Sequence, residues 1–173
     1  GGVSFTHDFS GRRTHAVTDG GSTQQYEYDA MGNLTAITDG NGNRTTYGND
    51  SWGNVVTLTR PDGTQEQYAY DHAGNITAAT DGSGNTTTYR YNSMNLLCER
   101  KDASGARESF FYDMEGRLCE HQDRDGRRQL YRHNMYGSPT LHENPAERLR
   151  ESWEYDAMGR LITATGGGMQ YRY

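Results

Sequence analysis

The fold is decided by a stretch near the start of the chain, Tyr26-Glu27-Tyr28-Asp29-Ala30-Met31-Gly32-Asn33-Leu34-Thr35-Ala36-Ile37-Thr38-Asp39-Gly40. This stretch recurs, and each copy carries a marker residue three places after an Asp or Asn. The markers are Gly11, Gly32, Gly53, Gly74, Asn95, Gly116, Gly137 and Gly159. They follow one another at intervals of 21 residues six times and then of 22. A fixed period predicts a repeat architecture, in which each unit buries its apolar face against its neighbours.

The first half of each repeat predicts a strand and a turn. Aromatic and polar residues alternate in Tyr26-Glu27-Tyr28, so both rings leave the same side of an extended chain. The next four residues fit a type I turn that opens at Asp29 and ends at Gly32. Such a turn, followed by a left-handed residue, joins many β-hairpins through a bulge. The marker that is not Gly is Asn95, and Asn tolerates positive φ well.

The second half predicts a returning strand. Residues 34–38 are rich in β-branched and aliphatic side chains, and a cluster of turn formers follows them. Counting across the turn, we expect Tyr28 to face Leu34. By the same count, Tyr26 faces Ala36. Each repeat is therefore predicted to be one β-hairpin.

The predicted motif has two aromatic positions, a turn opener, a marker and an aliphatic position. All eight residues three places before a turn opener are aromatic, although aromatic residues make up only 11% of the chain. We take these positions as a structural motif that builds the core. The motif residues are Tyr26, Tyr28, Asp29, Gly32, Leu34, Tyr47, Gly53, Val55, Tyr68, Tyr70, Asp71, Gly74, Ile76, Tyr89, Tyr91, Asn95, Leu97, Phe110, Tyr112, Asp113, Gly116, Leu118, Trp153, Tyr155, Asp156, Gly159 and Leu161.

The fold class predicted from this pattern is all-β, with tandem antiparallel hairpins in one long sheet. About 16 strands cannot stay flat, so we expect the sheet to curve or spiral strongly into an open arc of a shell. Residues 1–173 are predicted to form a single repeat domain of about eight hairpins. The chain begins and ends within a repeat, and we expect it to be a fragment of a larger protein.

Residues 138–150 are predicted to be irregular. Pro139 and Pro145 fall where the returning strand should lie, and the repeat is one residue longer there. Proline cannot donate to a ladder, so the segment is expected to be an edge, a bulge or a loop excursion. It is either a locally distorted strand or a flexible joint.

Composition and charge exclude some classes of function. Mean hydropathy is −1.03 and apolar residues are 32%, which alone favours disorder, but the aromatic residues are regularly placed. Arg124, Arg127 and Arg128 form the densest basic cluster, and Asp123 and Asp125 interrupt it. No basic stripe exists for a phosphate backbone, so no nucleic-acid partner is expected. No apolar run predicts a membrane span.

The sequence shows no catalytic motif, and we expect neither an enzyme nor a cofactor. The six histidines lack metal-ligand spacing. Asp39-x-Asn41-x-Asn43 starts like a calcium loop but lacks its later Gly and Glu, so no metal is expected. Cys98 and Cys119 are 21 residues apart, which places them two strands or roughly 9–10 Å apart. A disulfide needs Cα atoms within about 7 Å, so free thiols are predicted.

The motif Tyr-x-Tyr-Asp-x-x-Gly-Asn-Leu at residues 26–34, repeated with Ile at residues 68–76, resembles the YD repeat of RHS proteins. The bacterial RHS and toxin-complex type fits better than the teneurins. This resemblance implies a secreted or cell-surface shell of hairpins that encloses a toxic C-terminal polypeptide. The implied partners are flanking repeats and that polypeptide. RHS cores usually cleave themselves at an Asp-Pro site, and this sequence has none, so cleavage is not implied here.

Two functions are therefore considered. The first is a non-catalytic wall segment that encloses or displays another polypeptide. The second is a cell-surface adhesion module whose aromatic columns or turn-rich rims contact glycans or a receptor. Covered rings at Tyr26, Tyr68, Tyr89 and Trp153 would weaken the case for glycans. In either case, the open edges of the sheet predict edge-to-edge self-association.

Overall fold

The computed structural model describes residues 2–18 and 21–173, and these residues form two all-β units. The first unit ends at Thr86 and the second starts at Thr87. In the first unit the strands are β1 (Val3–His7), β2 (Arg13–Thr18), β3 (Thr23–Tyr28), β4 (Leu34–Asp39), β5 (Arg44–Asn49), β6 (Val55–Thr59), β7 (Gln65–Tyr70) and β8 (Ile76–Thr80). In the second they are β9 (Thr86–Tyr91), which starts at the junction, β10 (Leu97–Lys101), β11 (Arg107–Tyr112), β12 (Leu118–Gln122), β13 (Arg128–His133), β14 (Pro139–Asn144), β15 (Leu149–Tyr155), β16 (Leu161–Gly166) and β17 (Met169–Arg172).

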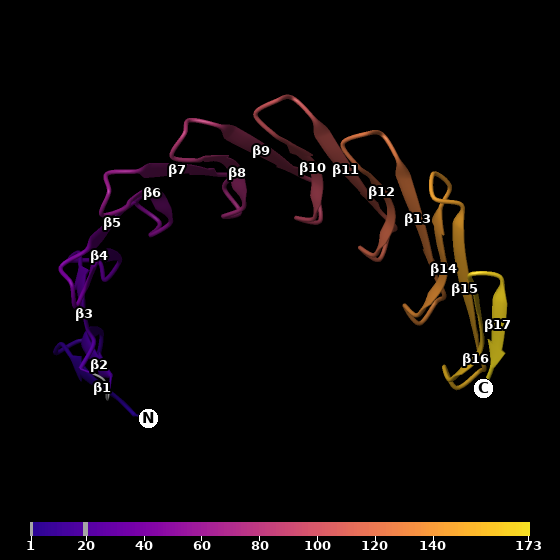
Figure 1. The fold of residues 1–173 in the computed structure, drawn as a ribbon, viewed down its shortest axis with the longest axis horizontal. Helices are drawn as coiled ribbons and strands as arrows, with labels where there is room; N and C mark the ends of the chain where they lie inside the picture. Colours follow the sequence, from indigo (N-terminus) through magenta and orange to yellow (C-terminus); the bar gives the residue numbers. More distant parts are fainter. Residues whose placement is uncertain (1, 19–20) are drawn as a thin grey trace. The chain divides into compact units, whose positions relative to one another are not determined.

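Within each unit, every strand pairs antiparallel with the next strand of the chain (Figure 1). Each odd-numbered strand from β1 to β15 turns back into the following even-numbered strand, which makes eight hairpins. The predicted all-β class and the tandem antiparallel hairpins are confirmed. Over the described part of the chain, no helix is long and apolar enough to cross a membrane.

Each hairpin is closed by an Asp-turn, the five residues that start at the turn-opening Asp or Asn. In residues 29–33, the amide of Gly32 donates to the carbonyl of Asp29 at 3.1 Å, and the amide of Asp29 donates to the carbonyl of Asn33 at 2.9 Å. Gly32 has a φ of +94°, in the left-handed region. Asn95 takes the same region with a φ of 59°. The predicted type I turn followed by a left-handed residue is confirmed.

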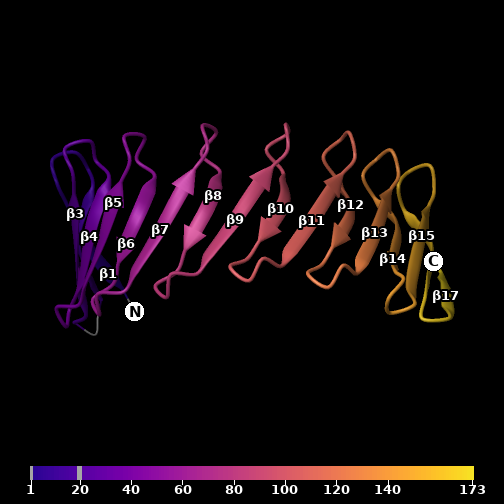
Figure 2. The same ribbon diagram turned by 90° about the horizontal axis from the view of Figure 1, so that it is seen from above.

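Successive hairpins are joined by connecting turns, and five of those that the structure describes have the same geometry, whereas the turn from β14 to β15 differs. In residues 39–43, the amide of Gly42 donates to the carbonyl of Asp39, and the amide of Asp39 donates to the carbonyl of Asn43, both at 3.0 Å. Since the strands alternate in direction, the Asp-turns of a unit lie at one edge of its sheet and the connecting turns lie at the other (Figure 2). The two edges of each sheet thus differ in sequence although most of their turns are of one kind.

A second bulge lies just beyond each Asp-turn, and the sequence analysis did not predict it. Tyr28 pairs with Leu34, but the next pair is Glu27 with Ala36, so Thr35 is an extra residue. The same register shift occurs in all eight hairpins. The extra residues are Thr14, Thr35, Val56, Thr77, Cys98, Cys119, Thr140 and Ile162.

This bulge corrects one predicted pairing. Tyr28 faces Leu34 as expected, whereas Tyr26 pairs with Ile37 and not with Ala36. A plain count across the turn gives Ala36 because it assigns one partner to every residue, and a bulge sets two residues against one. Cys98 and Cys119 occupy this bulge position in successive hairpins, and both are free thiols.

The segment 138–150 is more regular than predicted. Pro139 is the first residue of β14, where a missing N–H does no harm, and β14 pairs with both β13 and β15. The reading of this strand as an edge or a loop excursion is therefore wrong. The extra residue lies in the turn that connects β14 to β15, where Arg148 has a φ of 54°.

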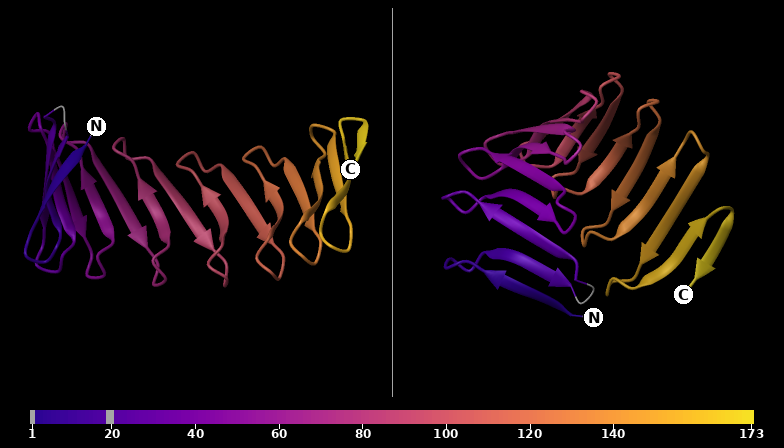
Figure 3. Two further views of the ribbon diagram at one scale, coloured as in Figure 1. Left: turned by 90° about the horizontal axis from the view of Figure 1, so that it is seen from below. Right: turned by 60° about the vertical axis from the view of Figure 1, so that its left-hand side comes forward.

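Each unit is a single layer of sheet, with little that is fully buried. Among the side chains that the structure describes, the buried apolar ones belong to Ala16 and Ala36 alone. The chain exposes 11676 Å² of accessible surface, whereas a compact protein of 19.4 kDa exposes about 8500 Å². Figure 3 shows the one-layer hairpins of the two units, with the C-terminal end of the second unit in yellow. Stability must therefore come from ladders, turns and contacts between adjacent strands.

We predict that Gly53→Ala destabilises the chain more than Gly74→Ala. Both glycines have positive φ, of +87° and +84°, so each substitution costs about 1–2 kcal/mol in backbone strain. A Cβ at Gly53 would also lie 2.7 Å from Oδ1 of Asn33 in the preceding Asp-turn, whereas none at Gly74 meets an atom within 4 Å. Moving the Asn33 side chain would add about 1 kcal/mol for a lost hydrogen bond.

The measurement is the free energy of unfolding in urea for the two variants and the parent. Equal losses for the two substitutions would show that adjacent Asp-turns do not pack on each other.

Candidate functional site

The described residues contain no obvious catalytic or metal centre. Within residues 2–18 and 21–173, no group of three or more His, Cys, Asp or Glu side chains could hold a metal ion. The site is therefore built from the structural motif itself, beginning with the carboxylate that opens each Asp-turn.

The turn-opening carboxylate holds its turn through three hydrogen bonds. Oδ1 of Asp71 accepts from the amides of Ala73 and Asn75, both at 2.9 Å. Its Oδ2 accepts from the side-chain amide of Asn75 at 3.0 Å. These donors, the Asn75 side chain first, hold the pKa of Asp71 below its ordinary value. The carboxylate replaces the backbone acceptors that a tight turn lacks.

In the eight Asp-turns, the choice of Asp or Asn as opener varies with the residue four places after it. Where that residue carries an amide or a guanidinium, as in Asp29 with Asn33 and Asp113 with Arg117, the opener is Asp and its Oδ2 accepts from it at 2.8 and 2.6 Å. Where it is Leu96 or Ser138, the opener is Asn. The eight combinations are Asp8 with Arg12, Asp29 with Asn33, Asp50 with Asn54, Asp71 with Asn75, Asn92 with Leu96, Asp113 with Arg117, Asn134 with Ser138 and Asp156 with Arg160.

The aromatic residue just before the opener couples its hairpin to the preceding one. The hydroxyl of Tyr70 donates to the carbonyl of Val55 at 2.8 Å, and that of Tyr112 donates to the carbonyl of Leu97 at 2.8 Å. Asn49 stands in this column in place of Tyr, and its Nδ2 donates to the carbonyl of Leu34 at 2.9 Å. Burial raises the pKa of both tyrosines. The acceptor is in each case the first residue of the returning strand, one place before the bulge.

The remaining motif residues fall into rows across the strands. The second aromatic column pairs with the aliphatic column, as in Tyr155 with Leu161. The first aromatic column pairs with the residue two places after the bulge residue, and these partners vary. The pairs are Tyr47 with Leu58, Tyr68 with Ala79, Tyr89 with Arg100, Phe110 with His121 and Trp153 with Ala164.

Two rows stack aromatic rings on histidines. The ring of Phe110 lies 4.8 Å from that of His121, and the ring of Tyr131 lies 5.0 Å from that of His142, in both cases nearly parallel. In the first repeat, the guanidinium of Arg13 lies 3.9 Å from the Phe5 ring centroid. Cation–π contact thus explains an arginine in an aliphatic column. The rings of Tyr26, Tyr68, Tyr89 and Trp153 are half-buried.

The arginines that cluster in the sequence are each paired with a carboxylate. Arg124 lies 2.8 Å from Glu108, Arg127 lies 3.2 Å from Asp125, and Arg128 lies 2.6 Å from Glu120. Their charges are therefore matched locally.

An apolar edge in each unit was not predicted from the sequence. Five of the six methionines lie at the tips of Asp-turns, and all five are exposed, Met114 to 94%. Phe9 and Trp52 occupy equivalent turn tips, whereas the described connecting turns carry no exposed large apolar side chain. We call this set the apolar edge, and its members are Phe9, Met31, Trp52, Met94, Met114, Met135, Tyr136 and Met158. The sequence does contain a sign of this edge. Large apolar residues occur at the two middle positions of the Asp-turns but not at those of the connecting turns.

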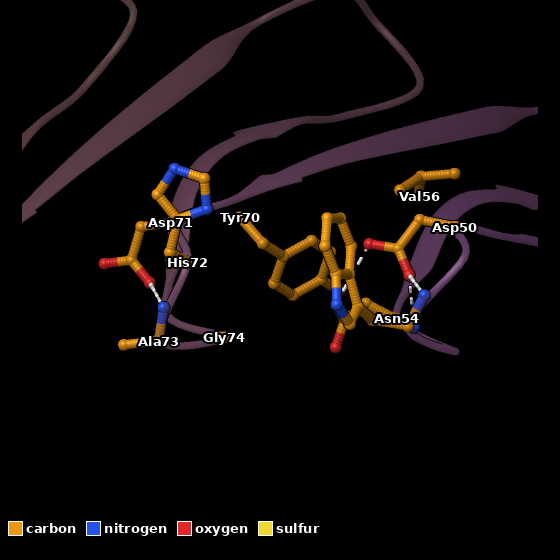
Figure 4. Close-up of a pocket in the computed structure, with 9 residues that line it drawn as sticks. Asp50, Asn54, Val56, Tyr70, Asp71, His72, Ala73 and Gly74 are labelled. Carbon is orange, nitrogen blue, oxygen red and sulfur yellow. Dashed lines mark hydrogen bonds between the residues drawn. The ribbon is translucent and has the colours of Figure 1, made fainter.

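A cleft of about 360 Å³ opens between two neighbouring Asp-turns of the first unit. Its walls come from the turns that follow β5 and β7, and its lining includes Asp50, Trp52, Tyr70, Asp71 and His72. In Figure 4 the rings of Tyr70 and His72 lie near each other, with Asp50 on the opposite side of Tyr70. The cleft joins aromatic surface to carboxylates.

Residues 2–173 match the family model described as the teneurin YD-shell. The chain belongs to the teneurin YD-shell family. The predicted YD-repeat identity is thus confirmed, and membership of this family supports a structural role in a shell wall. No protein with a curated description matches the sequence.

Solved structures similar to this YD-shell chain are much longer toxin-complex proteins. The crystal structure of TcdB2-TccC3-Cdc42 matches with a TM-score of 0.60 and 13% identity, covering 95% of this chain and 11% of the other. TcdB2-TccC3 matches with the same TM-score and identity, over 95% of this chain and 12% of the other. A variant of the Photorhabdus luminescens Tc holotoxin pore matches with a TM-score of 0.57 and 14% identity, over 95% and 11%. At these identities the likeness shows a shared fold.

We predict that Asp156→Asn lowers the melting temperature and that adding Arg160→Leu restores most of the loss. The amide introduced by D156N must turn one N–H toward a donor, either the guanidinium of Arg160 or the turn amides, because an arginine side chain donates hydrogen bonds and accepts none. The double substitution reproduces the Asn92 and Leu96 combination, which forms the same turn. Melting temperatures of the single and double variants test this, and additive losses would contradict it.

We predict that stability rises with pH between about pH 2 and pH 5. The pKa values of Asp29, Asp50 and Asp71 are lowered, first by the side-chain amide four places on. Their unfolded pKa is about 3.9, so their contribution is complete above that value and is lost as pH falls through the folded pKa values. Thermal melting across this range is the measurement. D71N/N75L should flatten the slope, and a melting temperature that does not fall toward pH 2 would refute the assignment.

Proposed function

We propose that the chain is a segment of a shell wall that encloses or displays a C-terminal polypeptide of its parent protein. The observation that carries the proposal is the ladder. Within each unit, every strand is hydrogen-bonded to its neighbours in the chain, without a gap between hairpins. Such a layer excludes a folded polypeptide by continuity, and it needs no reaction of its own.

The exposed surface supports this role. The excess of accessible surface over a compact protein of the same mass means that a sheet face of each unit has no second layer among the described residues. On one face, the two aromatic columns and their aliphatic partners are half-buried, which leaves ring surface to be covered. An enclosed polypeptide and flanking repeats would supply that cover.

The proposed partners and location follow from the family. The proposed partners are the flanking repeats of the parent and the enclosed polypeptide, and the proposed location is outside the cell or on its surface. Among the described residues, β1 pairs with β2 alone and β17 with β16 alone. Those open edges support the proposal that the isolated chain self-associates edge to edge.

A second candidate function is adhesion through the apolar edge. Type I turns accept small polar residues at their middle positions, so turn formation does not require Trp52 or Met114 there. Their exposure, at 81% and 94%, is unfavourable unless a partner covers them. This edge favours a protein receptor over a glycan, because methionine offers no hydrogen bond of useful strength to a sugar.

The test uses the full-length product of the gene. On limited proteolysis, the polypeptide that follows the repeats is expected to survive for at least ten times longer than the same polypeptide expressed alone. Substituting Gly53, Gly74 and Gly116 by Val should open the Asp-turns and remove that protection. Equal cleavage rates with and without the repeats would overturn the enclosing role.

Methionine oxidation in the same protein separates the two candidates. Under the shell proposal, Met114 and Met158 oxidise at similar rates with and without a candidate receptor. Protection of these residues only when the receptor is added would favour adhesion.

A further inference from the structure

The cleft between the Asp-turns of residues 50–54 and 71–75 combines the features of a cation site. It has a volume of about 360 Å³, within the usual range for small-ligand sites. Its lining brings together the rings of Trp52 and Tyr70 with the carboxylates of Asp50 and Asp71. Among the described residues that line it, none is Lys or Arg.

Trp52 is the feature that local structure does not explain. It occupies the third position of its turn, where other repeats carry Ala73 or Met94, and its side chain is 81% exposed. The turn needs only its amide, which donates to Oδ1 of Asp50 at 2.9 Å. The indole is therefore free to contact a ligand, and Trp offers a cation the best aromatic face.

The two carboxylates contribute charge more than hydrogen bonds. Each already accepts three hydrogen bonds inside its own turn, with Asn54 and Asn75 as the side-chain donors. An ionised carboxylate has about four acceptor sites, so roughly one is left on each. The hydroxyl of Tyr70 is also engaged, since it donates to Val55.

This inventory discriminates between classes of ligand. A sugar would need several free donors and acceptors at fixed positions, and the two carboxylates, Asn54 and Tyr70 are largely committed, which leaves the His72 ring and the Trp52 N–H. An organic cation needs a negative potential and an aromatic surface, and both are present. An anion would meet two carboxylates.

We propose that this cleft binds an organic ammonium group, with its charge near Asp50 and Asp71 and its alkyl groups against Trp52 and Tyr70. A primary ammonium, as on a lysine side chain, and a trimethylammonium, as on choline, share this chemistry. The site is independent of the shell role, because it uses two turns of the first unit only.

The test observes Trp52 directly. The chain has two tryptophans, and Trp153→Phe leaves Trp52 as the single indole while keeping an aromatic ring where Phe5 and Phe110 stand in other repeats. W153F is titrated with choline, n-butylammonium and 3,3-dimethylbutan-1-ol, the neutral isostere of choline. We expect saturable fluorescence changes with one or both cations and none with the alcohol. The cation that binds with the higher affinity shows whether the natural ligand carries a trimethylammonium, as choline does, or a primary ammonium, as lysine does.

Variants then locate the site by ligand-observed NMR on the otherwise unchanged chain. Trp52→Met, which installs the residue found at the equivalent Met31 and Met94, should weaken binding by roughly tenfold. D50N/N54L copies the Asn92 and Leu96 combination, so the turn should still form while one negative charge is lost. It should weaken binding of the cation. Met31→Ala is the matched control in the preceding turn and should leave binding unchanged.

Circular dichroism melting confirms that each variant is folded before its binding is compared. Equal binding of the alcohol and choline would overturn the proposal, as would a W52M variant that is folded and binds as the parent does. The absence of any saturable change with both cations would also overturn it.

Discussion

The hydrogen bonds that the turn-opening Asp or Asn side chain accepts are the constraint on which the rest of the chain depends. A one-layer sheet cannot rely on a deep core, so each hairpin must be closed locally before neighbours can pair with it. At Asp71, one carboxylate accepts hydrogen bonds from two backbone amides of the turn and from the side-chain amide of Asn75. The left-handed residue at the marker then lets the chain reverse. The same turn closes each of the eight hairpins.

The bulge and the tyrosine before the opener extend this local order from one hairpin to the next. The bulge sets two residues against one and shifts the register at the same place in every hairpin. The first residue of the returning strand then presents its carbonyl to the following hairpin, and a Tyr hydroxyl or an Asn amide donates to it. Asn49, which replaces Tyr in this column, keeps the bond. The coupling is therefore between nearest neighbours, as in other repeat proteins.

Much of the fold could be predicted from the sequence because turn chemistry is local. The period, the type I turn, the tolerance of Asn95 for positive φ and the pairing of Tyr28 with Leu34 all follow from residues close in the chain. The second bulge could not be predicted, because Thr35 and Cys98 are ordinary strand residues and nothing in their sequence marks an unpaired position. β14 was misjudged because Pro139 was weighed as a strand breaker without its place at the start of the strand.

The candidate site was less predictable. The aromatic columns stand out by their period, but the exposure of the turn tips depends on what lies outside the turn, and the sequence of a single repeat does not contain that. The cleft beside Trp52 depends on two neighbouring turns, so its lining residues are about 20 positions apart and become one site only through the ladder. The periodicity places those residues side by side, yet it assigns them no ligand.

Measuring the register of the hairpins tests the proposed repeat structure most directly, because the bulge, the tyrosine hydrogen bonds and the aromatic rows all depend on that register. Interstrand nuclear Overhauser effects in an isotopically labelled sample report it pair by pair. The account predicts contacts of Tyr26 with Ile37, Tyr47 with Leu58 and Tyr68 with Ala79. Contacts of these three tyrosines with Ala36, Thr57 and Ala78 instead would mean that the bulge is absent and would contradict it.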